Sequence, residues 1–106
     1  MKLNSKVLDK LMNSDIIKSI YPMVDRIETI VENDEDGVPF YNIDINIYLN
    51  DDSINPTNMY TKGMDPHYLV GVHMIDLLKY LNISTRQIEQ IYIKLFNPEG
   101  KLIYPS

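Results

Sequence analysis

The feature that most constrains the fold of this chain is a strictly alternating segment at residues 40–49. Its odd positions all carry large, mostly apolar side chains: Tyr41, Ile43, Ile45, Ile47 and Leu49. Its even positions are polar at the centre and aromatic at the ends: Phe40, Asn42, Asp44, Asn46 and Tyr48. Because successive side chains of a strand point to opposite faces, this period of two predicts a half-buried β-strand. We therefore expect a sheet with one apolar face and one polar face.

A neighbouring segment is expected to pair with this strand as the other half of a hairpin. Residues 24–32 alternate less regularly, but Ile27, Thr29 and Val31 share one side. Between the two segments, residues 33–39 are rich in turn-forming types and include an Asp-Gly pair that suits a positive φ. We therefore expect an antiparallel hairpin over residues 24–49.

Helices are expected before and after this hairpin. Residues 5–21 carry two apolar stripes separated by a capping sequence at Asn13, which predicts one broken helix or two short ones. Further along, Asp65 and Pro66 match the start of a helix, and an apolar stripe follows over residues 70–81. This stripe must pack on the sheet, so the second helical region is expected to link two pairs of strands.

A second hairpin completes the expected fold. Residues 90–96 alternate again, residues 97–100 match a type I turn, and residues 101–104 return as a short strand. The element order is then α-α-β-β-α-β-β. We predict a single α+β domain over residues 1–106, with a mainly antiparallel four-stranded sheet made from two hairpins and a crossover helix. Both outer strands of such a sheet would have free edges.

Negative charge is concentrated in the first hairpin. The net charge is −5, and nine of the 15 acidic residues lie within residues 24–52, where Arg26 is the only base. An acidic patch is expected around the turn, formed by Glu32, Asp34, Glu35 and Asp36. A surface of this sign repels phosphate backbones, so direct nucleic-acid binding is disfavoured. The patch is either ordinary solvated surface or a contact for a basic protein.

Composition disfavours several kinds of chemistry. The chain contains no Cys, which removes disulfides, thiolate catalysis and Cys-based zinc sites. It has no glycine-rich phosphate loop, dinucleotide fingerprint or HExxH motif, and the match of Asp34, Asp36 and Gly37 to a calcium loop is partial. We expect no cofactor, no metal site and no enzymatic activity.

The sequence also carries hints about location. It has no apolar run of membrane-spanning length and no apolar leader segment, so we expect no membrane partner and a cytoplasmic location. Ile, Asn, Lys and Tyr are abundant, whereas Ala and Trp are absent, which favours an AT-rich genome such as that of a phage. For a viral protein, the expected location is the host cytoplasm or the virion.

A small-ligand site is one alternative function. His73 and Asp76 share a helix face, so the carboxylate could orient the imidazole as a base, although a polar helix flank facing water is the simpler interpretation. Tyr60 and His67 flank the helix start, where free N–H groups bind anions, but Asp65 would cap the same groups. The two histidines lie on different helix faces and do not form a metal pair.

The polar sheet face is the preferred candidate for contact with a partner. Its expected members are Phe40, Asn42, Asp44, Asn46, Tyr48, Tyr92 and Phe96. Exposed aromatic residues are enriched at protein interfaces. They also stack bases on RNA-binding sheets, but the acidic hairpin argues against that use. Alternatively, the N-terminal helices cover this face.

These observations favour a non-enzymatic protein–protein interaction or assembly module. Its partner would be another protein or a second copy, reached through the sheet face, a free strand edge or the acidic hairpin. The alternatives are a small ligand-binding protein or enzyme that uses the His73 and Asp76 helix face, and an acidic inhibitor of a host nucleic-acid-binding protein. Binding by such an inhibitor would weaken as salt rises.

Overall fold

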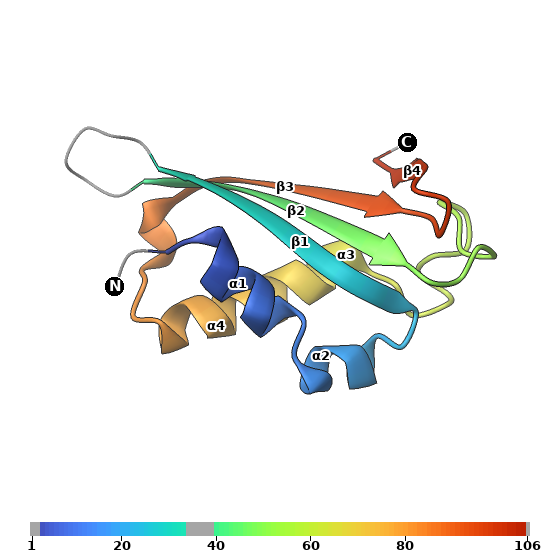
Figure 1. Ribbon diagram of the computed structural model, residues 1–106, viewed down its shortest axis with the longest axis horizontal. Coiled ribbons are helices and arrows are strands. Elements are labelled where there is room, and N and C mark those ends of the chain that lie inside the picture. Colours follow the sequence, from blue (N-terminus) through green and yellow to red (C-terminus); the bar gives the residue numbers. More distant parts are fainter. Residues whose placement is uncertain (1–2, 34–39, 106) are drawn as a thin grey trace.

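A four-stranded sheet carries all the helices on one of its faces (Figure 1). The computed structural model describes residues 3–33 and 40–105. In chain order the elements are α1 (Ser5–Met12), α2 (Asp15–Ile20), β1 (Val24–Asn33), β2 (Tyr41–Leu49), α3 (Pro66–Tyr68), η1 (Leu69–Met74), α4 (Ile75–Tyr80), η2 (Thr85–Gln87), β3 (Ile88–Phe96) and β4 (Leu102–Tyr104). Because α3, η1 and α4 follow one another directly, this order confirms the predicted α-α-β-β-α-β-β arrangement.

The sheet is mixed rather than purely antiparallel. Its strand order is β1-β2-β3-β4; the β1–β2 and β3–β4 pairs are antiparallel, and the central β2–β3 pair is parallel. The parallel pair arises because the helical crossover returns the chain to the end of the sheet where β2 began. The two hairpins therefore lie side by side, and β2 of the first pairs with β3 of the second.

The break that the sequence predicts near Asn13 separates α1 from α2. The side chain of Asn4 accepts a hydrogen bond from the Val7 amide at the start of α1, and that of Ser14 accepts one from the Ile17 amide at the start of α2. Side-chain caps of this kind satisfy amides that have no partner within the helix. Both helices turn apolar residues toward the sheet, so the open face of the sheet is not covered by them (Figure 1).

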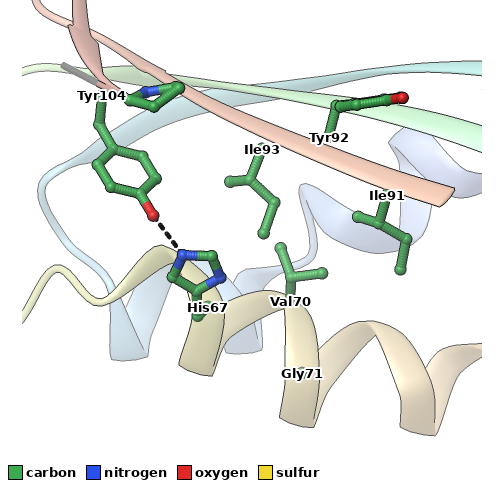
Figure 2. Close-up of a pocket in the computed structure, with 8 residues that line it drawn as sticks. His67, Val70, Gly71, Ile91, Tyr92, Ile93 and Tyr104 are labelled. Carbon is green, nitrogen blue, oxygen red and sulfur yellow. Dashed lines mark hydrogen bonds between the residues drawn. The ribbon is translucent and has the colours of Figure 1, made fainter.

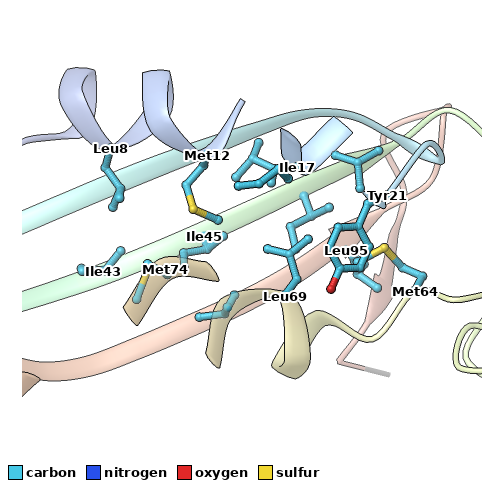
Figure 3. Close-up of a cluster of buried hydrophobic side chains, with 14 of the residues drawn as sticks. Leu8, Met12, Ile17, Tyr21, Ile43, Ile45, Met64, Leu69, Met74 and Leu95 are labelled. Atoms are coloured by element: carbon cyan, nitrogen blue, oxygen red, sulfur yellow. The ribbon is translucent and has the colours of Figure 1, made fainter. Parts of the chain in front are cut away.

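The predicted apolar face of β2 forms the centre of the core. Ile43, Ile45 and Ile47 are fully buried, and Figure 3 shows Ile43 and Ile45 with their neighbours between the sheet and the helices. From the helical side, Leu8 and Met74 are also fully buried. Tyr41 and Leu49 are buried as well, and the even-numbered side chains of β2 between them are half-buried, which confirms the alternation predicted for this strand.

The crossover helix begins at the predicted position but is not regular throughout. The Asp65 carboxylate accepts hydrogen bonds from the amides of His67 and Tyr68, and Pro66 occupies the first turn. After α3, the η1 segment is π-helical before α4 resumes the α-helical pattern. Within η1, Gly71 is exposed and lies beneath β3.

The polar segment that joins β2 to α3 is fixed to the core. Ile54 and Met59 are buried, and the Asn58 side chain bonds the Ser53 carbonyl and the Asn55 amide. The acidic residues expected at the first hairpin turn, Asp34, Glu35 and Asp36, lie outside the described residues. Within the described parts of the chain, no helix has the length and apolar character needed to cross a membrane.

Candidate functional site

One edge of the sheet, that of β1, is closed by side chains of α1. The side-chain amide of Asn13 bonds both backbone groups of Ile27. Its Nδ2 donates to the Ile27 carbonyl at 2.7 Å, and its Oδ1 accepts from the Ile27 amide at 2.8 Å. The Asp9 carboxylate accepts from the Thr29 amide at 2.6 Å and also from the Thr29 hydroxyl. The expectation that both outer strands have free edges is therefore wrong for β1.

The spacing along both elements explains this closure. The Ser5 hydroxyl accepts from the Val31 amide at 2.9 Å, so the three bonding residues, two in α1 and one at its C-cap, are spaced four apart. Residues four apart lie on one helix face, and alternate residues of a strand direct their backbone groups toward the same edge. The closed stretch of β1 therefore offers few free amides to another strand.

The opposite edge of the sheet is open over most of β3. The last strand, β4, is short and pairs with β3 only at Leu95 and Phe96. Among the described residues, no strand pairs with the outer side of β3 before Leu95. This stretch of β3 therefore behaves as an edge strand, with backbone groups available for pairing.

An apolar groove runs between this free edge and the crossover helix, and we call it the β3 groove. Figure 2 shows its larger part, with Ile91 and Ile93 above and His67, Val70 and Gly71 below. This part has a volume of about 450 Å³. A second part of about 270 Å³ continues along the strand toward Ile88 and shares Ile91 with the first.

The wall of the β3 groove is suited to apolar side chains. Ile88, Ile91 and Ile93 are half-buried, and Ile75 contributes a further half-buried apolar side chain from the helix. A Cβ atom at Gly71 would meet no atom within 4 Å, so this glycine leaves open space beside the strand. Apolar pockets along a free strand edge are the features that bind an added strand and its alternate side chains.

One end of the β3 groove is closed by a contact between the crossover helix and β4. The His67 Nε2 atom and the Tyr104 hydroxyl form a hydrogen bond, and the two rings meet edge to face with their centroids 5.6 Å apart. Burial raises the pKa of the Tyr104 hydroxyl, and the neighbouring Tyr60 and Asp65 add to the rise. Tyr104 therefore remains a neutral hydrogen-bonding group at ordinary pH.

The polar face of the sheet is open, but part of its aromatic surface is engaged within the fold. Tyr48 and Phe96 stack with ring centroids 5.0 Å apart, and the Arg26 guanidinium lies 3.9 Å from the centroid of the Tyr48 ring. Tyr92 and Phe40 are exposed. Two of the four aromatic residues predicted as interface candidates thus contact each other at one end of this face.

The polar candidates on this face lie in rows across the strands. Asn46 is flanked by Glu28 on β1 and Lys94 on β3. Its Oδ1 atom is buried and has no hydrogen-bond partner within the described structure. The corresponding rows for the other two polar candidates are Ile30–Asp44–Tyr92 and Glu32–Asn42–Gln90. The face is polar at its centre and carries exposed apolar side chains toward its margins.

The stack at the end of the open face makes a modest contribution to stability. We expect Arg26→Ala to lower the free energy of unfolding by about 0.5–1 kcal/mol, because it removes a cation from the face of an aromatic ring. Chemical denaturation would measure the change. Asp25→Ala is the matched control, since Asp25 forms only an exposed ion pair with Arg26, at 3.7 Å. An equal loss of stability in both variants would mean that the contact between Arg26 and the Tyr48 ring does not stabilise the fold.

The residues proposed for a small-ligand site do not converge. His73 packs edge to face against Tyr21, with ring centroids 5.8 Å apart, whereas Asp76 is exposed. No hydrogen bond or ion pair joins His73 to Asp76 in the described structure. Burial raises the pKa of Tyr21, with further contributions from Tyr68 and Asp65.

Of these candidates, only His67 lines the β3 groove. Tyr60 is exposed, and it lies near enough to Tyr104 to influence its pKa. Glu32, the one described member of the predicted acidic patch, is also exposed. Within residues 3–33 and 40–105, no group of three His, Asp or Glu side chains is placed to hold a metal ion.

The residues that distinguish the two edges were not singled out from the sequence. Ser5 and Asp9 are ordinary polar positions of a short helix, and Asn13 was predicted only to interrupt it, until α1 is placed against β1. A usable signal for the open edge was the short final strand after the turn at residues 97–100, which can cover little of β3. Comparison with models of protein families, with curated proteins and with solved structures found no match for this chain.

Proposed function

We propose that this protein is a protein-interaction module that binds an extended segment of a partner at the free edge of β3. The observation that carries this proposal is the contrast between the two edges of one sheet. The β1 edge is bonded by Asn13, Asp9 and Ser5, whereas the β3 edge is unpaired up to Leu95 among the described residues. Proteins usually protect exposed strand edges, so an edge left open beside an apolar groove favours a binding role.

Strand addition would use both features of this edge. The backbone of the added segment would exchange hydrogen bonds with β3, which supplies affinity with little dependence on sequence. Alternate side chains of the segment would enter the β3 groove between Ile91 and Gly71, which supplies specificity. The expected partner segment is therefore extended, with apolar residues at alternate positions.

The charge distribution supports this edge rather than the acidic hairpin. Acidic side chains such as Glu28 and Glu32 lie on β1, two strands away from the free edge. On β3 itself, Glu89 is the single acidic residue, and Lys94 lies on the same strand. An uncharged apolar segment can therefore approach β3 without entering the most acidic part of the surface.

Selection from a library of random decapeptides would test the proposal, with the protein at low concentration. We expect the selected peptides to alternate apolar and polar residues, and their amide chemical-shift effects to fall on β3 and on residues 67–71. Gly71→Leu should weaken their binding by at least about tenfold, or about 1.4 kcal/mol, because the new side chain fills the groove. It should not destabilise the helix, since Leu has a higher helix propensity than Gly.

The matched control is Ile30→Asp, which changes an exposed residue on β1, away from the groove. This variant should bind the selected peptides as tightly as the original protein. The proposal would be contradicted if no peptide bound above background. Equal binding to the Gly71→Leu protein, or chemical-shift effects confined to the open face or to residues 51–63, would also contradict it.

A further inference from the structure

We infer that the segment bound at this edge is β3 of a second copy, paired antiparallel about a two-fold axis through Tyr92. This inference rests on the proposed strand addition and names its partner. A two-fold contact brings the same patch of both copies together, so the patch must be complementary to itself. The free stretch of β3 can be tested for that property residue by residue.

The ends of the free stretch fix its centre. At one end, Tyr41 pairs with Ile88 and Asn42 pairs with Gln90, so Glu89 has no partner on β2 and forms a bulge. At the other end, Leu95 is already paired with β4. The regular, unpaired stretch is therefore residues 90–94, and its central residue is Tyr92.

Antiparallel pairing about Tyr92 matches like with like on both faces. On the helix side, Ile91 of each copy would lie opposite Ile93 of the other, so both members of each cross-strand pair are apolar. On the open side, Gln90 would lie opposite Lys94, and Tyr92 opposite its own copy. Cross-strand apolar and aromatic pairs of this kind each stabilise a sheet.

A shift of the axis to Ile91 is less favourable. That register would place Glu89 of each copy opposite Ile93 of the other, on the side of the sheet that faces the β3 groove. A carboxylate at an apolar pair position would lose water without gaining a partner. The self-complementary register is therefore the one centred on Tyr92.

Two further observations favour a second copy as the occupant. With a net charge of −5, two copies repel each other, and that repulsion is smallest where acidic residues are fewest. Nine of the 15 acidic residues lie within residues 24–52, which include β1 and β2, whereas residues 90–94 carry Lys94 and no acid. Gly71, which is exposed and lines the β3 groove, would also face the second copy beside the strands.

Cysteine cross-linking tests the position of the axis directly, because the chain contains no cysteine of its own. A residue on a two-fold axis between antiparallel strands faces its own copy, with Cβ atoms about 4.5–5.5 Å apart. Tyr92→Cys should therefore give a disulfide-linked dimer on mild oxidation. Ile30→Cys is the matched control, because Ile30 lies on the same face and in the same row of the sheet but on β1, and it should give no disulfide-linked dimer.

Charged substitutions at Tyr92 distinguish a loss of strand pairing from a loss of folding. Tyr92 is 50 % exposed, so the fold should accept a charged side chain there. Sedimentation velocity should show a dimer for the original protein. Tyr92→Lys and Tyr92→Glu should each weaken this dimer by about tenfold or more, whereas an equimolar mixture of the two should restore association as a mixed dimer.

The outcomes distinguish this inference from the proposed function. A monomer at all concentrations, or a dimer that neither Tyr92 variant affects, would overturn the two-fold pairing through Tyr92. Equal cross-linking of Tyr92→Cys and Ile30→Cys would overturn it as well. In each of these cases, selected peptides that still bind the β3 edge would leave the strand-addition function standing with a different partner.

Discussion

Replacing Asn13 with alanine should lower the free energy of unfolding by about 2–3 kcal/mol. The side chain makes three hydrogen bonds, of which two satisfy the amide and the carbonyl of Ile27 on β1 and one reaches the Asp9 carbonyl. Each part-buried backbone group left without a partner costs about 1–3 kcal/mol, and partial access of water reduces that cost here. Urea denaturation followed by circular dichroism would measure the loss.

Asn13→Asp provides the control for this effect. The aspartate has nearly the same shape and can still accept from the Ile27 amide, but it cannot donate to the Ile27 or Asp9 carbonyls. Its second carboxylate oxygen would instead face those two carbonyl oxygens, so we expect Asn13→Asp to be no more stable than Asn13→Ala. If Asn13→Ala changed the free energy of unfolding by less than about 0.5 kcal/mol, a typical surface effect, the contact with β1 would not be a stabilising one.

Truncating Ile45 to alanine should lower the free energy of unfolding by about 3–4 kcal/mol. Ile45 is 0 % exposed at the middle of the central strand and is surrounded by helix and sheet side chains (Figure 3). Removing its outer carbons loses their transfer free energy and leaves a cavity that close packing around it cannot fully fill. Thermal and urea unfolding would both report the change.

Ile30→Ala is the matched comparison for this core variant. Ile30 has the same side chain and lies on the neighbouring strand, but it is 43 % exposed on the open face of the sheet. We expect Ile30→Ala to lower the free energy of unfolding by less than about 1 kcal/mol, because this side chain buries little apolar area on folding. Similar losses for the two variants would mean that the open face is buried in solution, for instance by a partner.

Local patterns in the sequence were sufficient to predict the elements and the apolar core. The alternation at residues 40–49 identified β2 and its buried face, and the stripe at residues 70–81 identified the crossover helix. The capping sequence that begins at Asn13 and the Asp65 cap marked helix starts that the structure confirms. These predictions succeed because periodicity and capping depend on residues close together in the chain.

Features that depend on the relative placement of elements could not be predicted in this way. That Asn13 interrupts the helix is visible from its neighbours, but that its side chain bonds Ile27 depends on the path of α1 along β1. The π-helical turn at η1 has no compositional signature in residues 69–74. The β3 groove likewise exists because β4 covers only the end of β3, a matter of pairing length rather than of residue type.

The hydrogen bonds from α1 to β1 also set an upper limit on assembly by strand addition. A sheet that exposed both edges could add copies at each end without limit and grow into a filament. Here Asn13, Asp9 and Ser5 occupy the positions where a third copy would have to pair. Growth through the β3 edge would therefore stop once that edge is filled. The polar side chains of α1 and its C-cap thus prevent the addition of further copies at the β1 edge.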